Sequence, residues 1–383
     1  MATTQGKGAE GMQAAVRADR RDAHADNLPR ILVIATGGTI ASLDDGSGLA
    51  PALSGEDLVA FVPELAQVAR ISVTQPMNLD STNVAPKDWR RMAEVVRENY
   101  DAYDGFVITH GTDTMAYTAA GLSYLIQDSS KSIVLTGSQL PMADPETDAK
   151  KNLYDAVRYA ASPAAHDVSV VFAGKAICGT RARKQRTRSL DAFTSVNAPV
   201  LADLDALDSA DVPSGSNGME GLTGLPDLSC PDGLDSCAAS SSTARQPRFY
   251  GKLDERVFVL KLTPGLSPEI FSLLSAADYS AVVVEAFGLG GIPDCGDTSL
   301  ADAVRRWLHD GKLLVFATQV PEEGCDPTVY EVGRAFCDLE GVLLAGDMTS
   351  EAVLAKTMWA LGQAREFDQV AELFYQPVNG DRS

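Results

Sequence analysis

A continuous apolar run at Arg30–Ala35 ends directly in the glycine pair Gly37-Gly38. Such a run is typical of a strand buried on both faces, as in a parallel sheet that helices cover from both sides. Similar runs recur at Ile71–Val73, Gly105–Ile108, Ser132–Leu135 and Val168–Phe172. Helical patterns at Trp89–Asn99 and Met115–Ile126 lie between them. This alternation predicts an α/β fold with a mainly parallel sheet flanked by helices.

Composition predicts two domains and two segments outside them. Residues 1–27 have no apolar segment and are expected to form a disordered tail, and 28–202 form the larger domain. Between 203 and 247 the chain is rich in Ser, Gly, Pro, Asp and Ala, which predicts a flexible linker or insertion without a core of its own. Residues 248–383 are expected to form a smaller α/β domain. Its strands and helices are predicted at Val257–Leu262, Ala281–Glu285, Leu313–Ala317, Pro268–Ala276, Ser299–His309 and Ser350–Ala364.

Charge and cysteine usage exclude several classes of protein. Acidic residues outnumber basic ones by 52 to 32, and a net charge of -20 repels phosphate backbones and anionic lipids, so we expect neither nucleic acid nor a membrane as a partner. No stretch approaches the ~18 uninterrupted apolar residues of a spanning helix. The six cysteines show no metal-binding spacing, and Cys230 and Cys237 would pair only in an oxidising setting. We expect a cytoplasmic protein without metal or cofactor.

The first candidate motif, Thr36–Ile40, follows the first predicted strand. Ligands of open α/β sheets bind at such strand ends. Gly38 would let a substrate approach the backbone, and the hydroxyl of Thr39 is a candidate nucleophile beside N–H groups that stabilise an oxyanion. The alternative is a tight turn or a phosphate loop, although the motif lacks a full G-x-G-x-x-G pattern.

The second candidate motif, His110–Thr114, also follows a predicted strand and opens a helix. A threonine hydroxyl is a poor nucleophile until a base accepts its proton, so Thr112 beside Asp113 needs a third group such as a lysine. Taken alone, Asp113 fits a helix cap equally well, and His110 fits a core histidine.

The third candidate motif, Gly179–Lys184, follows the strand at Val168–Phe172. A lysine desolvated in a cleft can act as a base, which makes Lys184 a candidate. Five basic residues between Arg181 and Arg188 are also typical of a solvated face.

Together the motifs resemble one enzyme family. TGGTI, LDSTN, HGTDTMAYTAAGL, TGSQLPM, DAKKNLYDAV and GTRARK, in this order, resemble the bacterial L-asparaginases, and most closely their type I, cytoplasmic branch. LTPGLSPEI, EAFGLGGIP, FATQ and AGDMTSEAVLAKTMWAL resemble the C-terminal domain of that branch. The resemblance covers nearly all of 28–375 except the 203–247 insertion.

This resemblance implies hydrolysis of L-asparagine to L-aspartate and ammonia, with weaker turnover of glutamine. Thr39 would attack the amide carbon to form an acyl-enzyme, and Thr112, Asp113 and Lys184 match the family's Thr-Asp-Lys relay. Ser81 would bind the substrate α-carboxylate, and Asp113 would also pair with the α-ammonium. The remaining implied substrate-site residues are Gly38, Asp80, Gly111 and a wall at Gln139–Met142. The resemblance also implies a homodimer or homotetramer.

One departure concerns the segment Ala41–Pro51, which the resemblance implies is a mobile lid. The family usually places a tyrosine there to assist Thr39, whereas the nearest position here is Leu49. Water or a residue from elsewhere, such as Tyr330, would then have to take that role.

Two other functions remain open from the sequence. A glutaminase-like subunit of a tRNA-dependent amidotransferase carries the same motifs, but the charge of -20 and the mere tail before the first strand disfavour it. A catalytically silent amino-acid sensor would explain the missing lid tyrosine. The presence of Thr39, Thr112, Asp113 and Lys184 speaks against that sensor.

Overall fold

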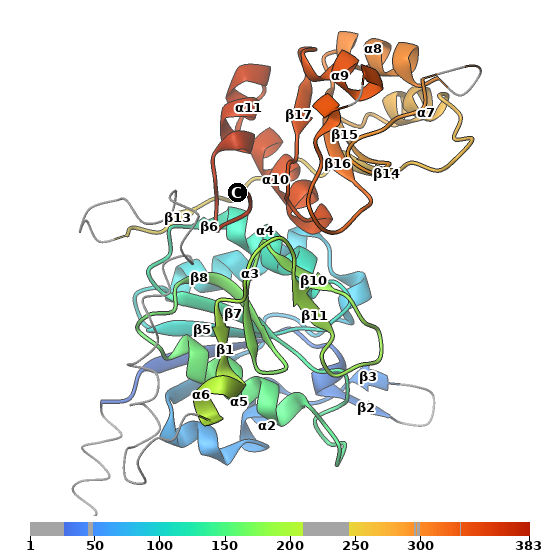
Figure 1. Cartoon of the computed structure of the whole chain (residues 1–383). Coiled ribbons are helices and arrows are strands. Elements are labelled where there is room, and N and C mark those ends of the chain that lie inside the picture. The colour runs from blue at the N-terminus through green and yellow to red at the C-terminus, as the bar shows by residue number, and fades with distance from the viewer. Residues whose placement is uncertain (1–26, 45–48, 210–244, 295, 297–298, 330) are drawn as a thin grey trace, which may run out of the picture.

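A large sheet forms the centre of the N-terminal part of the chain (Figure 1). The computed structural model describes residues 27–44, 49–209, 245–294, 296, 299–329 and 331–383. The sheet has seven strands in the order β12-β9-β8-β7-β5-β1-β4. Its strands are β1 (Arg30–Ala35), β4 (Arg70–Thr74), β5 (Gly105–Thr109), β7 (Ser132–Thr136), β8 (Asp167–Phe172), β9 (Lys175–Cys178) and β12 (Ala202–Asp203). β4, β1, β5, β7 and β8 pair in parallel, whereas β9 and β12 add an antiparallel edge.

The central strands β1, β5 and β7 of this sheet are mainly apolar, and they are buried on both faces. Alternate residues of a strand point to opposite faces. Leu32 and Ile34 of β1 pack with helices α3 (Pro86–Asn99) and α4 (Met115–Leu125). Ile31 and Val33 face the opposite layer. That second layer contains α2 (Gly55–Ala60), η2 (Pro63–Gln67) and α5 (Ala149–Ala160).

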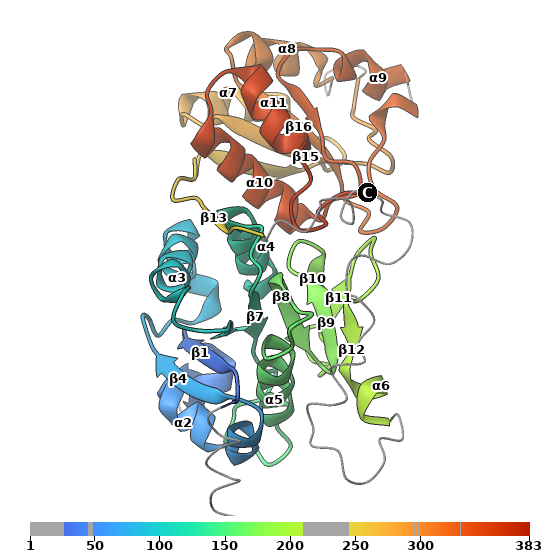
Figure 2. The same cartoon turned by 90° about the vertical axis from the view of Figure 1, so that its left-hand side faces the viewer.

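A second, smaller sheet lies in the C-terminal part of the chain (Figure 2). Its order is β14-β15-β16-β17, and all pairs are parallel. The strands are β14 (Val257–Lys261), β15 (Ala281–Ala286), β16 (Leu313–Thr318) and β17 (Val342–Leu344). The helices are α7 (Ile270–Ala276), α8 (Ala301–His309), α9 (Glu331–Cys337), α10 (Ser350–Gln363) and α11 (Phe367–Tyr375), with the short turn η5 (Pro327–Val329). The predicted two-part α/β fold is thus confirmed.

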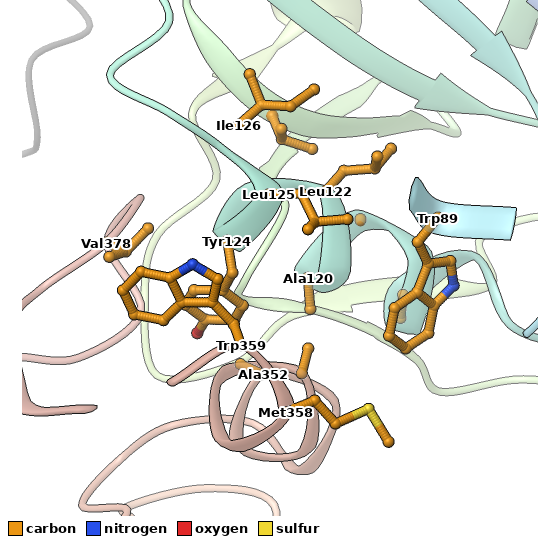
Figure 3. Packing of buried hydrophobic residues seen from close by; sticks show 14 of the residues in the cluster. Trp89, Ala120, Leu122, Tyr124, Leu125, Ile126, Ala352, Met358, Trp359 and Val378 are labelled. Carbon is orange, nitrogen blue, oxygen red and sulfur yellow. The ribbon is translucent and has the colours of Figure 1, made fainter. Parts of the chain in front are cut away.

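The two parts share one hydrophobic core through helices α4 and α10 (Figure 3). The ring of Tyr124 stacks on that of Trp359, with centroids 6.0 Å apart and an interplanar angle of 23°. Both side chains are fully buried. Helix α4 therefore packs on the second domain through its C-terminal half, and it begins directly after the His110–Thr114 motif.

Local sequence signals agree with the structure at several helix ends. The Ser54 hydroxyl accepts a hydrogen bond from the Asp57 amide, and the Asp57 carboxylate accepts one from the Ser54 amide, so the two residues form a capping box at α2. Pro86 is the first residue of α3, a position that suits proline because the N–H it lacks would have no partner within the helix there. Gly311 has a φ of 73° directly after the cap of α8, the conformation that a glycine adopts most easily.

Several short strands had no clear signal in the sequence. β10 (Ala182–Lys184) pairs with β11 (Phe193–Ser195), and β13 (Arg248–Phe249) pairs with β6 (Ile126–Gln127). In the predicted lid, η1 (Thr39–Ala41) is followed by the antiparallel pair β2 (Ser42–Asp44) and β3 (Leu49–Pro51). Helix α6 (Leu204–Ser209) lies at the start of the predicted insertion, and residues 210–244, with Cys230 and Cys237, lie outside the described residues. The domain boundaries stay predictions.

Candidate active site

The first two motifs meet because β1 and β5 are neighbouring parallel strands. Their carboxyl ends lie at the same edge of the sheet, as in other open α/β sheets that bind ligands there. Thr36 donates through both its amide and its hydroxyl to the carbonyl of Thr109, at 3.1 and 2.7 Å, which ties the two strand ends together. The loops that follow therefore leave the sheet side by side.

Glycine at position 38 allows the backbones of these loops to touch. Gly38 has φ 84° and ψ −179°, a region that only glycine adopts readily. A Cβ atom added there would collide with the backbone of Gly111. Thr39 follows at once as the first residue of η1, and its side chain is half-buried.

Ser81 brings a third loop to the same point. A Cβ atom added to Gly111 would lie 2.6 Å from the Ser81 hydroxyl oxygen, so these residues are in direct contact. Ser81 is 4% exposed, and its carbonyl accepts a hydrogen bond of 2.7 Å from the hydroxyl of Thr114. The structure thus brings together the candidate residues Gly38, Ser81 and Gly111.

Lys184 reaches the second motif from β10. Its ammonium donates to the Thr112 hydroxyl oxygen at 2.7 Å and to the Asp113 carboxylate at 2.6 Å. The Lys184 side chain is 16% exposed, whereas that of Asp113 is 58% exposed. A half-buried lysine held between a hydroxyl and a carboxylate is an arrangement that can transfer a proton to or from the hydroxyl.

Thr112 has a further partner in Gln139. The Thr112 hydroxyl donates to the Gln139 side-chain oxygen at 3.2 Å. Gln139 is held in turn by Asp148, because the backbone N–H of Gln139 donates to both carboxylate oxygens of Asp148, at 3.1 and 3.0 Å. Asn152 donates to Asp148 as well, at 3.1 Å. Asp148 and Asn152 were not among the sequence candidates, although both lie in the DAKKNLYDAV motif.

His110 has a structural environment. It is fully buried, one ring nitrogen lies 2.7 Å from the carbonyl of Gly111, and the other lies 3.0 Å from the hydroxyl of Thr118. Since a carbonyl only accepts, Nδ1 carries the proton and Nε2 accepts from Thr118. Burial lowers the pKa of His110 from 6.5 to about 4. The neutral ring therefore braces the loop that carries Thr112.

Asp80 is already engaged by its own turn. One carboxylate oxygen accepts from the amide and the hydroxyl of Thr82, at 2.8 and 2.7 Å, and so caps η3 (Ser81–Asn83). These hydrogen bonds lower the pKa of the Asp80 carboxyl. Asp80 thus orients the turn that presents Ser81.

Leu49 and Tyr330 are the two residues that the sequence connects with the missing lid tyrosine. Tyr330 lies outside the described residues, and Leu49 begins β3 in the lid hairpin. Across the described part of the chain, no three His, Cys, Asp or Glu side chains are grouped to hold a metal ion. No helix within the same residues is long and apolar enough to cross a membrane.

Comparison with known proteins agrees with the motifs. Residues 30–212 match the family model "Asparaginase, N-terminal", and residues 256–374 match "Glutaminase/Asparaginase C-terminal domain". An L-asparaginase of Thermococcus kodakarensis is 37% identical over 92% of this chain and 98% of its own length. The solved structure of that organism's thermostable L-asparaginase superposes with a TM-score of 0.78, at 36% identity over 92% of this chain and 99% of the other.

Two further relatives broaden this picture. L-asparaginase I of Vibrio cholerae has a TM-score of 0.74 at 27% identity, over 93% of this chain and 99% of the other. A subunit of the glutamyl-tRNA(Gln) amidotransferase of Metallosphaera sedula is 32% identical over 95% of this chain and 80% of its own length. The family models and the identity over nearly the whole length together show that this chain belongs to the asparaginase family.

Proposed function

We propose that this protein is an L-asparaginase that hydrolyses L-asparagine to L-aspartate and ammonia through a threonine nucleophile. The observation that carries the proposal is the contact of Lys184 with both Thr112 and Asp113, at 2.7 and 2.6 Å, next to the loop of Thr39. It is supported by 37% sequence identity to an L-asparaginase, over 98% of that protein's length.

The reaction needs a nucleophile and a site for a mobile proton. The hydroxyl oxygen of Thr39 forms a bond to the side-chain amide carbon, the C–N bond breaks, and the hydroxyl proton finally leaves with the nitrogen as ammonia. Water then adds to the acyl carbon, Thr39 recovers its proton, and aspartate leaves. Lys184 exchanges the mobile proton with Thr112, and the carboxylate of Asp113 holds the Lys184 ammonium beside that hydroxyl.

The substrate's own charges find complementary groups. The buried hydroxyl of Ser81 binds the α-carboxylate, and the more exposed carboxylate of Asp113 pairs with the α-ammonium. Gly38 and Gly111 let the loops of Thr39, Thr112 and Ser81 come into direct contact, and Asp80 holds the Ser81 turn. Glutamine carries one more methylene group, which displaces its amide from Thr39 and slows turnover.

The decisive experiment measures ammonia release from asparagine and glutamine by wild type, Lys184→Met and Lys175→Met. Lys175 is the matched control, because its ammonium pairs with Asp191, at 2.9 Å, and Asp191 is not one of the proposed relay residues. We expect rapid asparagine turnover by wild type and Lys175→Met, and a loss of at least about 100-fold in Lys184→Met. Near-normal turnover in Lys184→Met would refute the relay.

The nucleophile is tested separately. After rapid acid quench with asparagine, mass spectrometry should find an aspartyl ester on Thr39, and Thr39→Ala should lack it. An ester on Thr112 in the wild type would transfer the nucleophilic role to that residue.

A second candidate function is the glutaminase role within a tRNA-dependent amidotransferase, which the 32% identity to the Metallosphaera sedula protein favours. The same assay separates the two functions. Turnover of glutamine in clear excess over asparagine would support the amidotransferase role, and silence on both amides would support an amino-acid sensor.

The assembly and the location are also proposals. A homodimer or homotetramer agrees with the closed symmetry of most soluble oligomers, and light scattering after gel filtration tests it. A cytoplasmic location agrees with the unpaired thiols of Cys178, Cys325 and Cys337, because a reducing compartment keeps thiols free.

A further inference from the structure

The segment 378–383 returns from the second domain and lies at the junction of the two domains (Figure 2). Figure 3 shows Val378, at its start, beside the stacked rings of Tyr124 and Trp359. Nothing in the proposed reaction uses this segment, yet it makes buried polar contacts with both domains.

One set of these contacts fixes the turn that leads into β10. The carbonyl of Asn379 accepts from the Thr180 hydroxyl at 2.6 Å and from the Cys178 thiol at 2.8 Å. The carbonyl of Gly380 accepts from Nε of Arg181 at 2.6 Å. Thr180 and Arg181 are both 0% exposed. Two adjacent carbonyls of a segment about 200 residues away thus accept hydrogen bonds from the side chains of Cys178, Thr180 and Arg181.

Other contacts anchor the segment on both domains. The side-chain amide of Asn379 donates to the Ser123 hydroxyl and the Val168 carbonyl, both at 2.9 Å. On the other side, Asp381 is fully buried and pairs with the ammonium of Lys356, and it accepts from the Tyr124 hydroxyl at 2.9 Å. A buried polar network restricts the motion of the groups that it pairs.

A second link joins the same turn to the C-terminal domain. Arg181 pairs with Asp347 at 3.0 Å, and the Thr349 hydroxyl donates to the carbonyl of Thr180 at 2.9 Å. Groups of the C-terminal domain therefore hold the turn in addition to its own backbone hydrogen bonds, such as that from the Gly179 amide to the Val168 carbonyl.

Lys184 depends on this turn because β10 has only three residues. Among the strands of the described residues, β10 pairs only with β11, in a two-stranded sheet separate from the seven-stranded one. The partners of Lys184, by contrast, follow β5 of the seven-stranded sheet. At about 3.3 Å per residue, Lys184 lies about 10 Å along the chain from Arg181, so a tilt of about 6° at the turn moves it by about 1 Å.

We propose that segment 378–383 is a positioning element for Lys184, acting through Thr180 and Arg181, which sets the distance between Lys184 and Thr112. The catalytic importance of this distance rests on the proposed function. A displacement of 1 Å at a reacting group can lower a rate by about 100-fold, so a small loosening has a measurable effect.

The test compares three variants of one residue type. Thr180→Val keeps the shape of the side chain but removes the hydroxyl that donates to Asn379. Thr180→Ser keeps the hydroxyl. Thr357→Val is the control, because Thr357 is also buried and donates to a backbone carbonyl, that of Val353, within helix α10.

We expect Thr180→Val to lower kcat by about 10-fold with KM changed by less than about 2-fold, and Thr180→Ser to restore most of kcat. Thr357→Val should lose thermal stability to a similar extent while its kcat stays near that of the wild type. Unchanged kcat in Thr180→Val, or an equal loss of kcat in Thr357→Val, would overturn the proposal.

Hydrogen exchange gives a readout that does not need turnover. Backbone amides of 182–184 should exchange faster in Thr180→Val than in wild type, and at the wild-type rate in Thr357→Val. If the wild type releases no ammonia from either amide, the proposed function fails, and exchange still tests whether the segment holds β10. Equal exchange in all variants would refute the positioning role itself.

Discussion

Replacing Gly38 by alanine tests the contact on which the whole site depends. Gly38 has φ 84° and ψ −179°, and a side chain in this region costs about 1 to 3 kcal/mol of strain. The added Cβ would also collide with the backbone nitrogen and Cα of Gly111. Forcing an extra carbon into a packed place costs about 1 to 3 kcal/mol more.

The two terms add to a loss of about 2 to 6 kcal/mol in the free energy of unfolding. The matched control is Gly251→Ala. An added Cβ at Gly251, an exposed residue, meets nothing within 4 Å, and we expect a change of less than about 1 kcal/mol. Equilibrium unfolding in urea, followed by the fluorescence of the buried tryptophans, measures both variants.

The same substitution should impair turnover beyond its effect on stability. Relief of the collision requires the loops of Thr39 and Thr112 to separate, and a displacement near 1 Å predicts a loss of about 100-fold in kcat. Gly251→Ala should keep wild-type turnover. The reasoning is wrong if the unfolding midpoints of Gly38→Ala and Gly251→Ala agree, because the backbones of the two loops would then not touch at Gly38.

Three other predictions concern stability and cofactors. Burial lowers the pKa of His110 to about 4, so as the pH falls the unfolded chain binds a proton at this ring before the folded chain does. His110 therefore contributes stability that is complete above pH 6.5 and is lost as the pH falls toward 4. That contribution is about 3 kcal/mol, and urea unfolding of His110→Asn against wild type at pH 7.5 and 4.5 should show a weaker pH dependence in the variant. Trp359→Ala should lower the free energy of unfolding by about 3 to 5 kcal/mol, since the ring fills the junction between α4 and α10, and an unchanged melting temperature would contradict that packing. EDTA should leave ammonia release unchanged, whereas inactivation reversed by a divalent ion would exclude a metal-free mechanism.

The local sequence was sufficient for most of the parallel strands and for the identity of the motifs. The uniformly apolar runs at β1 and β5 predict strands buried on both faces, because only helices on both sides remove such side chains from water. Ser54 and Asp57 predict the start of α2 because the signal lies within one turn. The glycine and threonine motifs, in their order along the chain, resemble those of one enzyme family, and that resemblance indicates the family.

Contacts between distant segments were decided only by the tertiary structure. Lys184 and Thr112 are 72 residues apart, and no local pattern sets the path of β10 that brings them within 2.7 Å. The role of Gln139 as a hydrogen-bond partner of Thr112, and the support that Asp148 gives to Gln139, likewise depend on where a loop runs. Periodicity reports whether a residue is buried, but it does not report which residue it meets.

The segment 378–383 is the clearest case of this difference. Its sequence, Val-Asn-Gly-Asp-Arg-Ser, reads as a polar loop, yet Asp381 is fully buried and Asn379 and Gly380 accept hydrogen bonds from the turn before Lys184. Polar residues are normally solvated, and only the fold supplies the buried partners that make their burial favourable. The sequence by itself thus determined the family and the candidate site residues. The packing of the two domains against each other decided which distant residues contact the turn that leads to Lys184.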